Sequence, residues 1–488
     1  MFAAFDNFPA LLIWLPLIGG VLSFFMKSDK AAKATAMFFS LLTLGVIVTN
    51  LFYTDAKYQL LNQVSYVWLP GIGASFALIL DGLTRTLTLL TAIVFPIAIL
   101  NVPAGKYKNP NIFFGLLMLT FCGLLGVFMS IDALMFYLFW ELALIPVYFL
   151  SSIYGGEKRI KATFKFFIYT FVGSLFLLVG IFFIYLKTSG SFSLVSFYNA
   201  TPTNDDQLWV FLLFLIAYAI KMPIFPFHTW QPEAYEQAPT PVTMILSGVM
   251  VKMGLFGVIR WLLPMLPYAA KVYAEPMTIL IVIGMIYASF IAIKQDSVKR
   301  LIAYSSIAHV GLMAAGLFTL KAVAFNGVFI QMFNHGINIV GLWLIADLIE
   351  RQTGVSKISE LGGVAKKAPV LAIFMVIIAF ANIALPMTNA FVGEFMLFNG
   401  LFQMKPWIAA LAGVSIILSA IYTLNMVKNV FYGEVSAAVV SFKDINALQI
   451  GMLTVITLLI FILGLYPTPF FNMISETVGL ILNKFGTN

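Results

Sequence analysis

Charged side chains lie inside several apolar segments of this 488-residue chain, where a charge is costly. Glu141 and Lys252 stand near the middle of their segments. Lys221 ends another segment, and Glu394 follows a proline break. At the centre of a bilayer such a charge costs about 3 kcal/mol, so it requires a partner, water or a function. Groups of this kind that exchange partners can pass protons, and we predict a proton pathway; for Glu141 the alternative is an ion pair that only joins two helices.

The lysines and their neighbours indicate how such a pathway would work. We expect Lys221 to be the partner of Glu141, because a Glu–Lys pair can release a proton when one member moves. Lys252 has no carboxylate within a helical turn, which suits a proton carrier; snorkelling to an interface is the alternative. Gly248, one turn before Lys252, leaves that helix face bare, and we expect room for water there.

Two histidines lie on consecutive apolar segments, in the sequences AYSSIAHVG and QMFNHG. Ser305 stands one turn before His309, and Gln331, His335 and Asn338 share one helix face. A polar stripe around a buried histidine indicates a hydrated proton relay. A histidine packed in the core is the alternative. Two axial haem ligands are a weaker one, because neither residue lies among small residues that would admit a porphyrin.

Prolines interrupt two of the charged segments. Pro223 and Pro226 follow Lys221, and Pro386 precedes Glu394. Each proline removes a backbone donor, and a broken helix at membrane depth survives only where protein or a water-filled cavity covers its freed carbonyls. Two breaks beside lone charges favour two repeats of opposite orientation.

The composition places the chain in a membrane. With 61% hydrophobic and 10% charged residues it is not an ordinary soluble domain. The single cysteine, Cys122, excludes a disulfide framework and cysteine-rich iron–sulfur or zinc sites. We predict an all-α polytopic protein of about 14 transmembrane helices. One membrane domain, 1–488, would contain three N-terminal helices (1–110), a first repeat (111–265), a second repeat (276–431) and a C-terminal helix with a tail (447–488).

Basic residues alternate between loops. One set of loops holds Lys27, Lys30, Lys33, Lys106, Lys108, Lys158, Arg159, Lys161, Lys294, Lys299, Arg300, Arg351, Lys357, Lys366, Lys367, Lys428 and Lys443. Loops rich in lysine and arginine stay in the cytoplasm. The bias therefore predicts both termini on the outer, periplasmic side, and it explains the net charge of +8 without nucleic acid.

Five segments together resemble a known family. They are LFWELALIPVYFL, KMPIFPFHTWQPEAYEQAPT, AYSSIAHVG, QMFNHG and FVGEF. They are similar to the antiporter-like subunits of respiratory complex I (NADH–quinone oxidoreductase) and of Mrp sodium/proton antiporters, and the resemblance covers nearly the whole chain. It implies fourteen helices and two inverted five-helix repeats, with helices 7 and 12 broken.

The resemblance also implies roles in proton transfer for individual residues. The residues that match the family's motifs are Glu141, Lys221, Lys252, His309, His335 and Glu394. Glu394 discriminates within the family, because M-type subunits carry glutamate there, whereas L- and N-type subunits and Mrp relatives usually carry lysine. Met387 departs from the pattern, since many relatives have glycine after the Leu-Pro break, and we expect a different local bend.

The resemblance further implies a translocase subunit that moves protons while partner subunits transfer electrons from NADH to quinone. FMN, iron–sulfur clusters, NADH and quinone would bind in those partners, with no cofactor or metal in this chain. Its neighbours would be L-type and N-type subunits and the lipid bilayer of a bacterial inner (plasma) membrane. The alternatives are a subunit of an Mrp-type sodium/proton antiporter or of a membrane-bound hydrogenase, a haem- or quinone-binding enzyme, and a structural spacer.

Overall fold

Long apolar helices form most of the computed structural model, which describes residues 7–53 and 61–485. Helices α1 to α8 are Phe8–Phe24, Asp29–Asn50, Gly82–Leu100, Pro110–Met129, Ala133–Tyr154, Arg159–Tyr185, Leu194–Asn199 and Asn204–Lys221. Helices α9 to α14 are Gln231–Gln237, Thr240–Ile245, Lys252–Gly257, Pro267–Ile293, Val298–Phe318 and Ala322–Thr353. Helices α15 to α20 are Val364–Lys367, Pro369–Asn382, Asn389–Met404, Pro406–Phe431, Ala447–Leu465 and Thr468–Leu482.

Within the described ranges, 11 helices are long and apolar enough to cross a membrane. Three further segments that the sequence predicts as spans fall outside this set for local reasons. Helix α1 has 17 residues, and α8 carries charges at both of its ends. Helix α16 ends at Asn382, and the chain resumes as α17 only at Asn389, after the break at Pro386.

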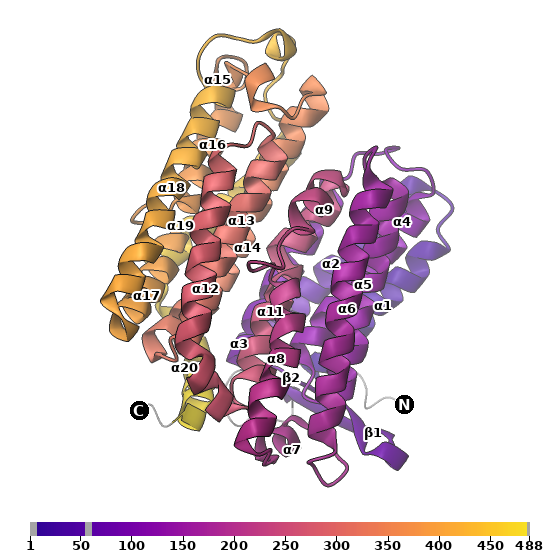
Figure 1. Cartoon of the computed structure of the whole chain (residues 1–488). Coiled ribbons are helices and arrows are strands. Elements are labelled where there is room, and N and C mark those ends of the chain that lie inside the picture. Colours follow the sequence, from indigo (N-terminus) through magenta and orange to yellow (C-terminus); the bar gives the residue numbers. More distant parts are fainter. Residues whose placement is uncertain (1–6, 54–60, 486–488) are drawn as a thin grey trace.

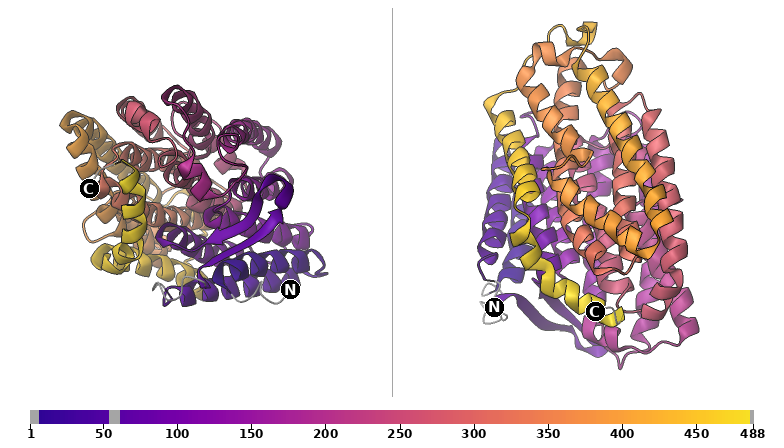
Figure 2. Two further views of the ribbon diagram at one scale, coloured as in Figure 1. Left: turned by 90° about the horizontal axis from the view of Figure 1, so that it is seen from below. Right: turned by 90° about the vertical axis from the view of Figure 1, so that its left-hand side faces the viewer.

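A β-hairpin precedes the third long helix, where the sequence predicts helix from Leu78. Strands β1 (Gln63–Leu69) and β2 (Ala74–Ile79) pair antiparallel. Helix α3 begins only at Gly82, because Asp81 caps it and forms a reciprocal capping box with Thr84. Figure 2 shows the hairpin across the lower end of the bundle.

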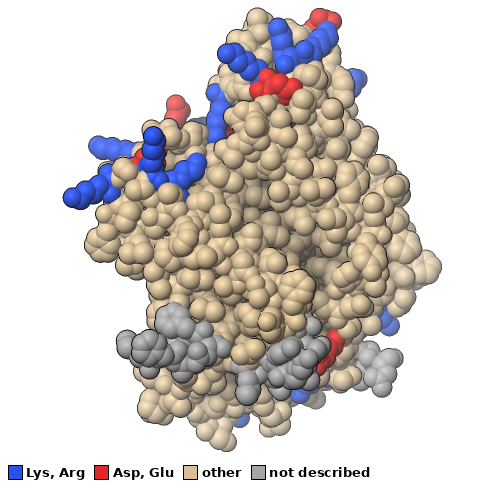
Figure 3. Space-filling model, turned by 180° about the vertical axis from the view of Figure 1, so that it is seen from behind, with Lys and Arg blue, Asp and Glu red and all other residues tan. Residues whose placement is uncertain are grey.

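The two ends of the bundle differ in charge. Lysine and arginine side chains gather at one end, the upper end in Figure 3, which we call the basic-loop end. It contains the α12–α13 connection with Lys294, Lys299 and Arg300, which the sequence assigns to a basic loop. The hairpin and the last part of α20 lie at the opposite end, which we call the far end (Figure 1).

Helix α14 lies between the two halves of the chain and organises the core. All of its membrane-length stretch is buried, and it packs against α3, α10, α13, α16, α17, α19 and α20. The N-terminal half and the C-terminal half stand on either side of it (Figure 1). Side chains on α14 therefore face groups from both predicted repeats.

Candidate proton-transfer site

Glu141 and Lys221 lie near one another without forming an ion pair. Lys221 is 2% exposed, and its ammonium group lies 5.4 Å from the centre of the Trp140 ring, a cation–π contact. Among the described residues its Nζ has no hydrogen-bond acceptor. Glu141 acts on it electrostatically, but neither Lys221 Nζ nor Glu141 Oε1 has a hydrogen-bond partner in the described part of the chain. The pairing that we expect from the sequence is therefore open in this structure.

The chain that follows Lys221 covers its own break. Pro223 and Pro226 prevent α8 from continuing, and the next helix, α9, begins only at Gln231. The Trp230 indole Nε1 donates to the carbonyl oxygen of Ile220 at 3.0 Å, which satisfies a group that the break frees. The break is thus buried in protein, as the sequence predicts for non-helical backbone at this depth.

Lys252 lies at the centre of the wholly buried segment Thr240–Leu262 and is 0% exposed. Its Nζ donates to the Ser247 carbonyl at 2.8 Å and lies 2.8 Å from Nδ1 of His335. Residues Leu246–Met250 form a wider π-helical turn just before it. Such turns occur frequently at functional sites.

The space that we expect beside Gly248 is filled. A Cβ at this position would lie 2.8 Å from Cγ2 of Val340, on α14. The prediction of room for water at that face is therefore wrong. The missing side chain instead lets α14 approach closely, and this approach places His335 against Lys252.

The two histidines connect Lys252 with the second broken helix. The ring centres of His335 and His309 are 6.1 Å apart. His309 Nδ1 lies 3.0 Å from Oε1 of Glu394, and Gln331 donates to the same oxygen at 3.1 Å. Both His309 and Glu394 are more than nine-tenths buried. Lys252, His335, His309 and Glu394 therefore form one continuous buried series, which extends from α11 through α14 and α13 to α17.

Asparagines hold the second break in place. Asn334 donates to the carbonyl oxygen of Asn389 at 2.7 Å, and the side-chain amides of Asn338 and Asn389 exchange two hydrogen bonds of 3.1 Å. The sequence places Asn338 on the polar face but does not single out Asn334. Its position three residues after Gln331 is the signal that would have found it.

The break itself contains two strained residues. Ala384 has φ 57° and Met387 has φ 75°, a left-handed conformation that side chains other than glycine rarely adopt. Met387 is the position that departs from the family pattern. Strain of this kind, about 1–3 kcal/mol per residue, persists where surrounding contacts over-determine the backbone.

Potential metal ligands do not cluster in the described part of the chain. No group of three or more histidine, cysteine, aspartate or glutamate side chains lies close enough to hold a metal ion there. The buried series consists instead of groups that donate and accept protons, hydrogen-bonded at Lys252–His335 and at His309–Glu394 and separated by 6.1 Å between the two rings.

Residues 130–419 match the family model described as NADH:quinone oxidoreductase/Mrp antiporter, TM. The chain is 36% identical to NADH-quinone oxidoreductase subunit M of Rickettsia typhi, with 98% of this chain and 99% of that one aligned. It is 33% identical to F420H2 dehydrogenase subunit M of Methanosarcina mazei, over 97% of this chain and 98% of the relative. A chain of respiratory complex I from Thermus thermophilus has a similar structure, with a TM-score of 0.91, 28% identity and coverage of 98% and 99%. The chain therefore belongs to the NADH:quinone oxidoreductase/Mrp antiporter family.

Proposed function

We propose that this chain is the M-type, antiporter-like subunit of a respiratory NADH:quinone oxidoreductase and moves protons across the membrane. The observation that carries the proposal is the buried series from Lys252 to Glu394, which crosses from one half of the chain to the other at mid-depth. Family membership and the relation to subunit M of Rickettsia typhi support the same function. Each charge moved against the membrane potential costs about 2.3 kcal/mol per 100 mV, which electron transfer in partner subunits would supply.

A proton enters from the basic-loop end, near Lys221 and Lys252. The Lys252 ammonium donates a hydrogen bond to Nδ1 of His335. In this arrangement Nδ1 carries no hydrogen and can take the proton from the lysine. The proton then crosses the 6.1 Å between the ring centres, which requires a bridging water molecule or a movement of the rings, and passes from His309 to Glu394. Glu394 releases it toward the far end.

The Glu141–Lys221 pair acts as the gate in this mechanism. In the open arrangement described above, Lys221 has no carboxylate in contact and lies over Trp140. Closing the pair would withdraw positive charge from the neighbourhood of Lys252 and favour protonation there. The neighbouring subunit would drive this change, since Glu141 lies on a partly exposed face of α5.

The number of spans, the orientation and the partners that we propose are those that membership of the family implies. We propose fourteen membrane-spanning helices, in which α1, α8 and the broken pair α16–α17 complete the 11 longer ones. The repeats 111–265 and 276–431 have opposite orientations, with both termini on the periplasmic side of a bacterial inner membrane. L-type and N-type subunits flank the chain. Partner subunits hold FMN, iron–sulfur clusters, NADH and quinone, and this chain holds no cofactor.

The test is proton pumping by the assembled complex with Lys252→Ala or Glu141→Ala. We expect both variants to assemble and to lose pumping coupled to NADH oxidation. Lys271→Ala, at an exposed lysine of α12, is the control and retains pumping. If both variants assemble and pump at the normal rate, the assignment is wrong.

A second candidate function differs from the first in the electron donor of the complex. The 33% identity to F420H2 dehydrogenase subunit M of Methanosarcina mazei favours a related complex that is not driven by NADH. The subunits that co-purify with the chain decide between the two. A NADH-binding flavin subunit supports the first candidate, and a subunit that oxidises F420H2 supports the second.

A further inference from the structure

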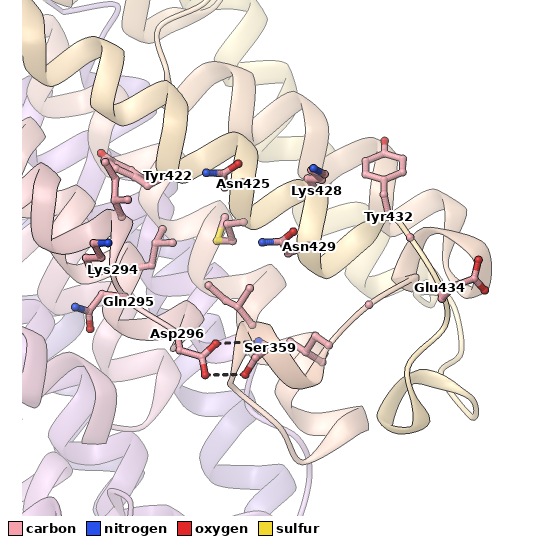
Figure 4. A pocket seen from close by; sticks show the side chains of 17 residues that line it. Lys294, Gln295, Asp296, Ser359, Tyr422, Asn425, Lys428, Asn429, Tyr432 and Glu434 are labelled. Atoms are coloured by element: carbon pink, nitrogen blue, oxygen red, sulfur yellow. Dashed lines mark hydrogen bonds between the residues drawn. The ribbon is translucent and has the colours of Figure 1, made fainter.

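A polar cleft opens at the basic-loop end, away from Lys221 and Lys252. Its volume is 680 Å³, and it lies between the end of α12, the loop around Ser359 and the last turns of α18. Charged and amide side chains line it, among them Lys294, Asp296, Asn425 and Lys428. Figure 4 shows these side chains and the two hydrogen bonds that Asp296 accepts from Ser359. A cleft of this size and polarity admits water from the basic-loop end.

Tyr422 lies deepest along α18 among the labelled residues of this cleft and is 1% exposed. Its hydroxyl donates to Oγ of Ser305 at 3.0 Å, and Asn382 donates to the same oxygen at 3.3 Å. Ser305 stands one helical turn before His309 on α13, and Asn382 is the last residue of α16 before the second break. The tyrosine hydroxyl thus contacts α13 directly, and Ser305 links it to the last residue of α16.

A second, much smaller cavity lies on the other side of Tyr422. Its volume is 10 Å³, about the space of one water molecule. Tyr422 lines it together with Ser415, Ser419, His309 and Glu394. Within the described chain, the Nε2 atom of His309 is buried and has no hydrogen-bond partner. A water molecule needs two to four polar partners, and this cavity offers them.

Tyr422 is therefore shared by two cavities, an open cleft that faces the basic-loop end and a much smaller one lined by His309 and Glu394. We propose that Tyr422 controls a second proton-access route, which joins the basic-loop end to His309 and Glu394 without passing Lys252. The proposal rests on the function proposed above: each pumping cycle then uses one proton delivered through Lys252 and one delivered through Tyr422, so loss of either route stops the cycle.

The transfer step needs only the tyrosine hydroxyl. A proton from water in the cleft binds to the hydroxyl oxygen while the original hydroxyl proton leaves toward Ser305 or the small cavity. One O–H bond forms, one breaks, and the side chain stays neutral. In the present structure the hydroxyl donates to Ser305 and Tyr422 lines both cavities, and we assign this as the closed arrangement. Closure prevents Glu394 from returning its proton to the basic-loop end.

The test uses the assembled complex in membrane vesicles with the basic-loop end facing outward. Tyr422→Phe keeps the ring and removes the hydroxyl, and we expect NADH-driven proton pumping to fall at least about tenfold. Tyr432→Phe, at a half-exposed tyrosine in the mouth of the same cleft, is the matched control and leaves pumping unchanged.

Substitutions at Ser305 separate proton transfer from packing. Ser305→Ala removes the acceptor and should reduce pumping as Tyr422→Phe does, whereas Ser305→Thr keeps a hydroxyl and should retain it. Normal pumping by Tyr422→Phe overturns the proposal, and so does an equal loss in the alanine and threonine variants. Lys252→Ala distinguishes the two proposals. If it blocks pumping while Tyr422→Phe pumps normally, only the second route fails; if both pump, the proposed function fails as well.

Discussion

The Lys252 ammonium group lies 2.8 Å from Nδ1 of His335, and this contact joins the two halves of the chain at mid-depth. While Lys252 is protonated it can only donate, so Nδ1 is then the acceptor and the hydrogen of a neutral His335 ring lies on Nε2. That nitrogen is buried and without a partner among the described residues. The contact therefore sets the direction in which a proton leaves His335, toward His309.

Replacing His335 should interrupt the series at this point. We expect His335→Gln, which fills similar space but cannot carry a proton, to lower pumping by about a hundredfold or more. The measurement is proton uptake per NADH oxidised in membrane vesicles. His228→Gln is the matched control, because the third histidine lies beside Tyr287 at the first break, outside the series. Equal loss in both variants would show damage to folding rather than to transfer.

Glu141 and Lys221 should act as one unit although they do not touch in this structure. We expect Glu141→Gln and Lys221→Met each to reduce pumping strongly, and the double variant to be no worse than the more severe single one. The readout is the coupling energy between the two substitutions, obtained from pumping rates. Strictly additive losses would mean that the two groups work independently and that the gate does not exist.

Met387→Gly should stabilise the protein. Met387 adopts φ 75°, and the left-handed conformation costs about 1–2 kcal/mol for a residue with a side chain. Glycine removes that cost but makes the unfolded chain more flexible, so the expected net gain is below about 1 kcal/mol. Thermal unfolding of the detergent-solubilised complex measures it. Met404→Gly, at the end of α17 with ordinary helical backbone, is the control and should destabilise.

The amide pair at the second break should respond differently to single and double replacement. Asn389→Leu leaves the buried amide of Asn338 unpaired, which costs about 1–3 kcal/mol. Replacing both asparagines with leucine removes the unpaired side-chain amide and leaves only the Ala390 N–H without its acceptor on Asn389, so the double variant should recover part of the lost stability. The midpoints of thermal unfolding for the three variants test this. A double variant that is less stable than either single one would contradict it.

Much of the site could be predicted from the sequence because charges in apolar segments are rare and costly. This argument identifies Glu141, Lys221, Lys252 and Glu394, and polar spacing adds the two histidines. Their order in space needs tertiary contacts, which one sequence does not contain. Only the structure brings His335 from α14 to Lys252 and His309 from α13 to Glu394.

The predictions that the structure contradicts, and the residue that the sequence analysis missed, also have physical causes. A glycine beside a buried lysine is compatible with water or with close helix packing, and at Gly248 packing prevails. The last two residues of strand β2, Leu78 and Ile79, are apolar, so in the sequence they read as the start of the span that follows. Tyr422 gives no sequence signal, because an aromatic residue in an apolar helix is ordinary until its hydroxyl is seen to contact Ser305.

The length and the anchoring of helix α14 have one more consequence. Its 32 residues extend about 48 Å, well beyond the roughly 30 Å of hydrocarbon. Its basic-loop end is anchored, since Asp347 and Arg351 pair with each other and both bond Asn101 on the neighbouring α3. His335 bonds Lys252 and lies beside His309 from this one helix, so a displacement of α14 at this point would change both distances in a single movement. Reception and delivery of the proton would then be coupled to one another.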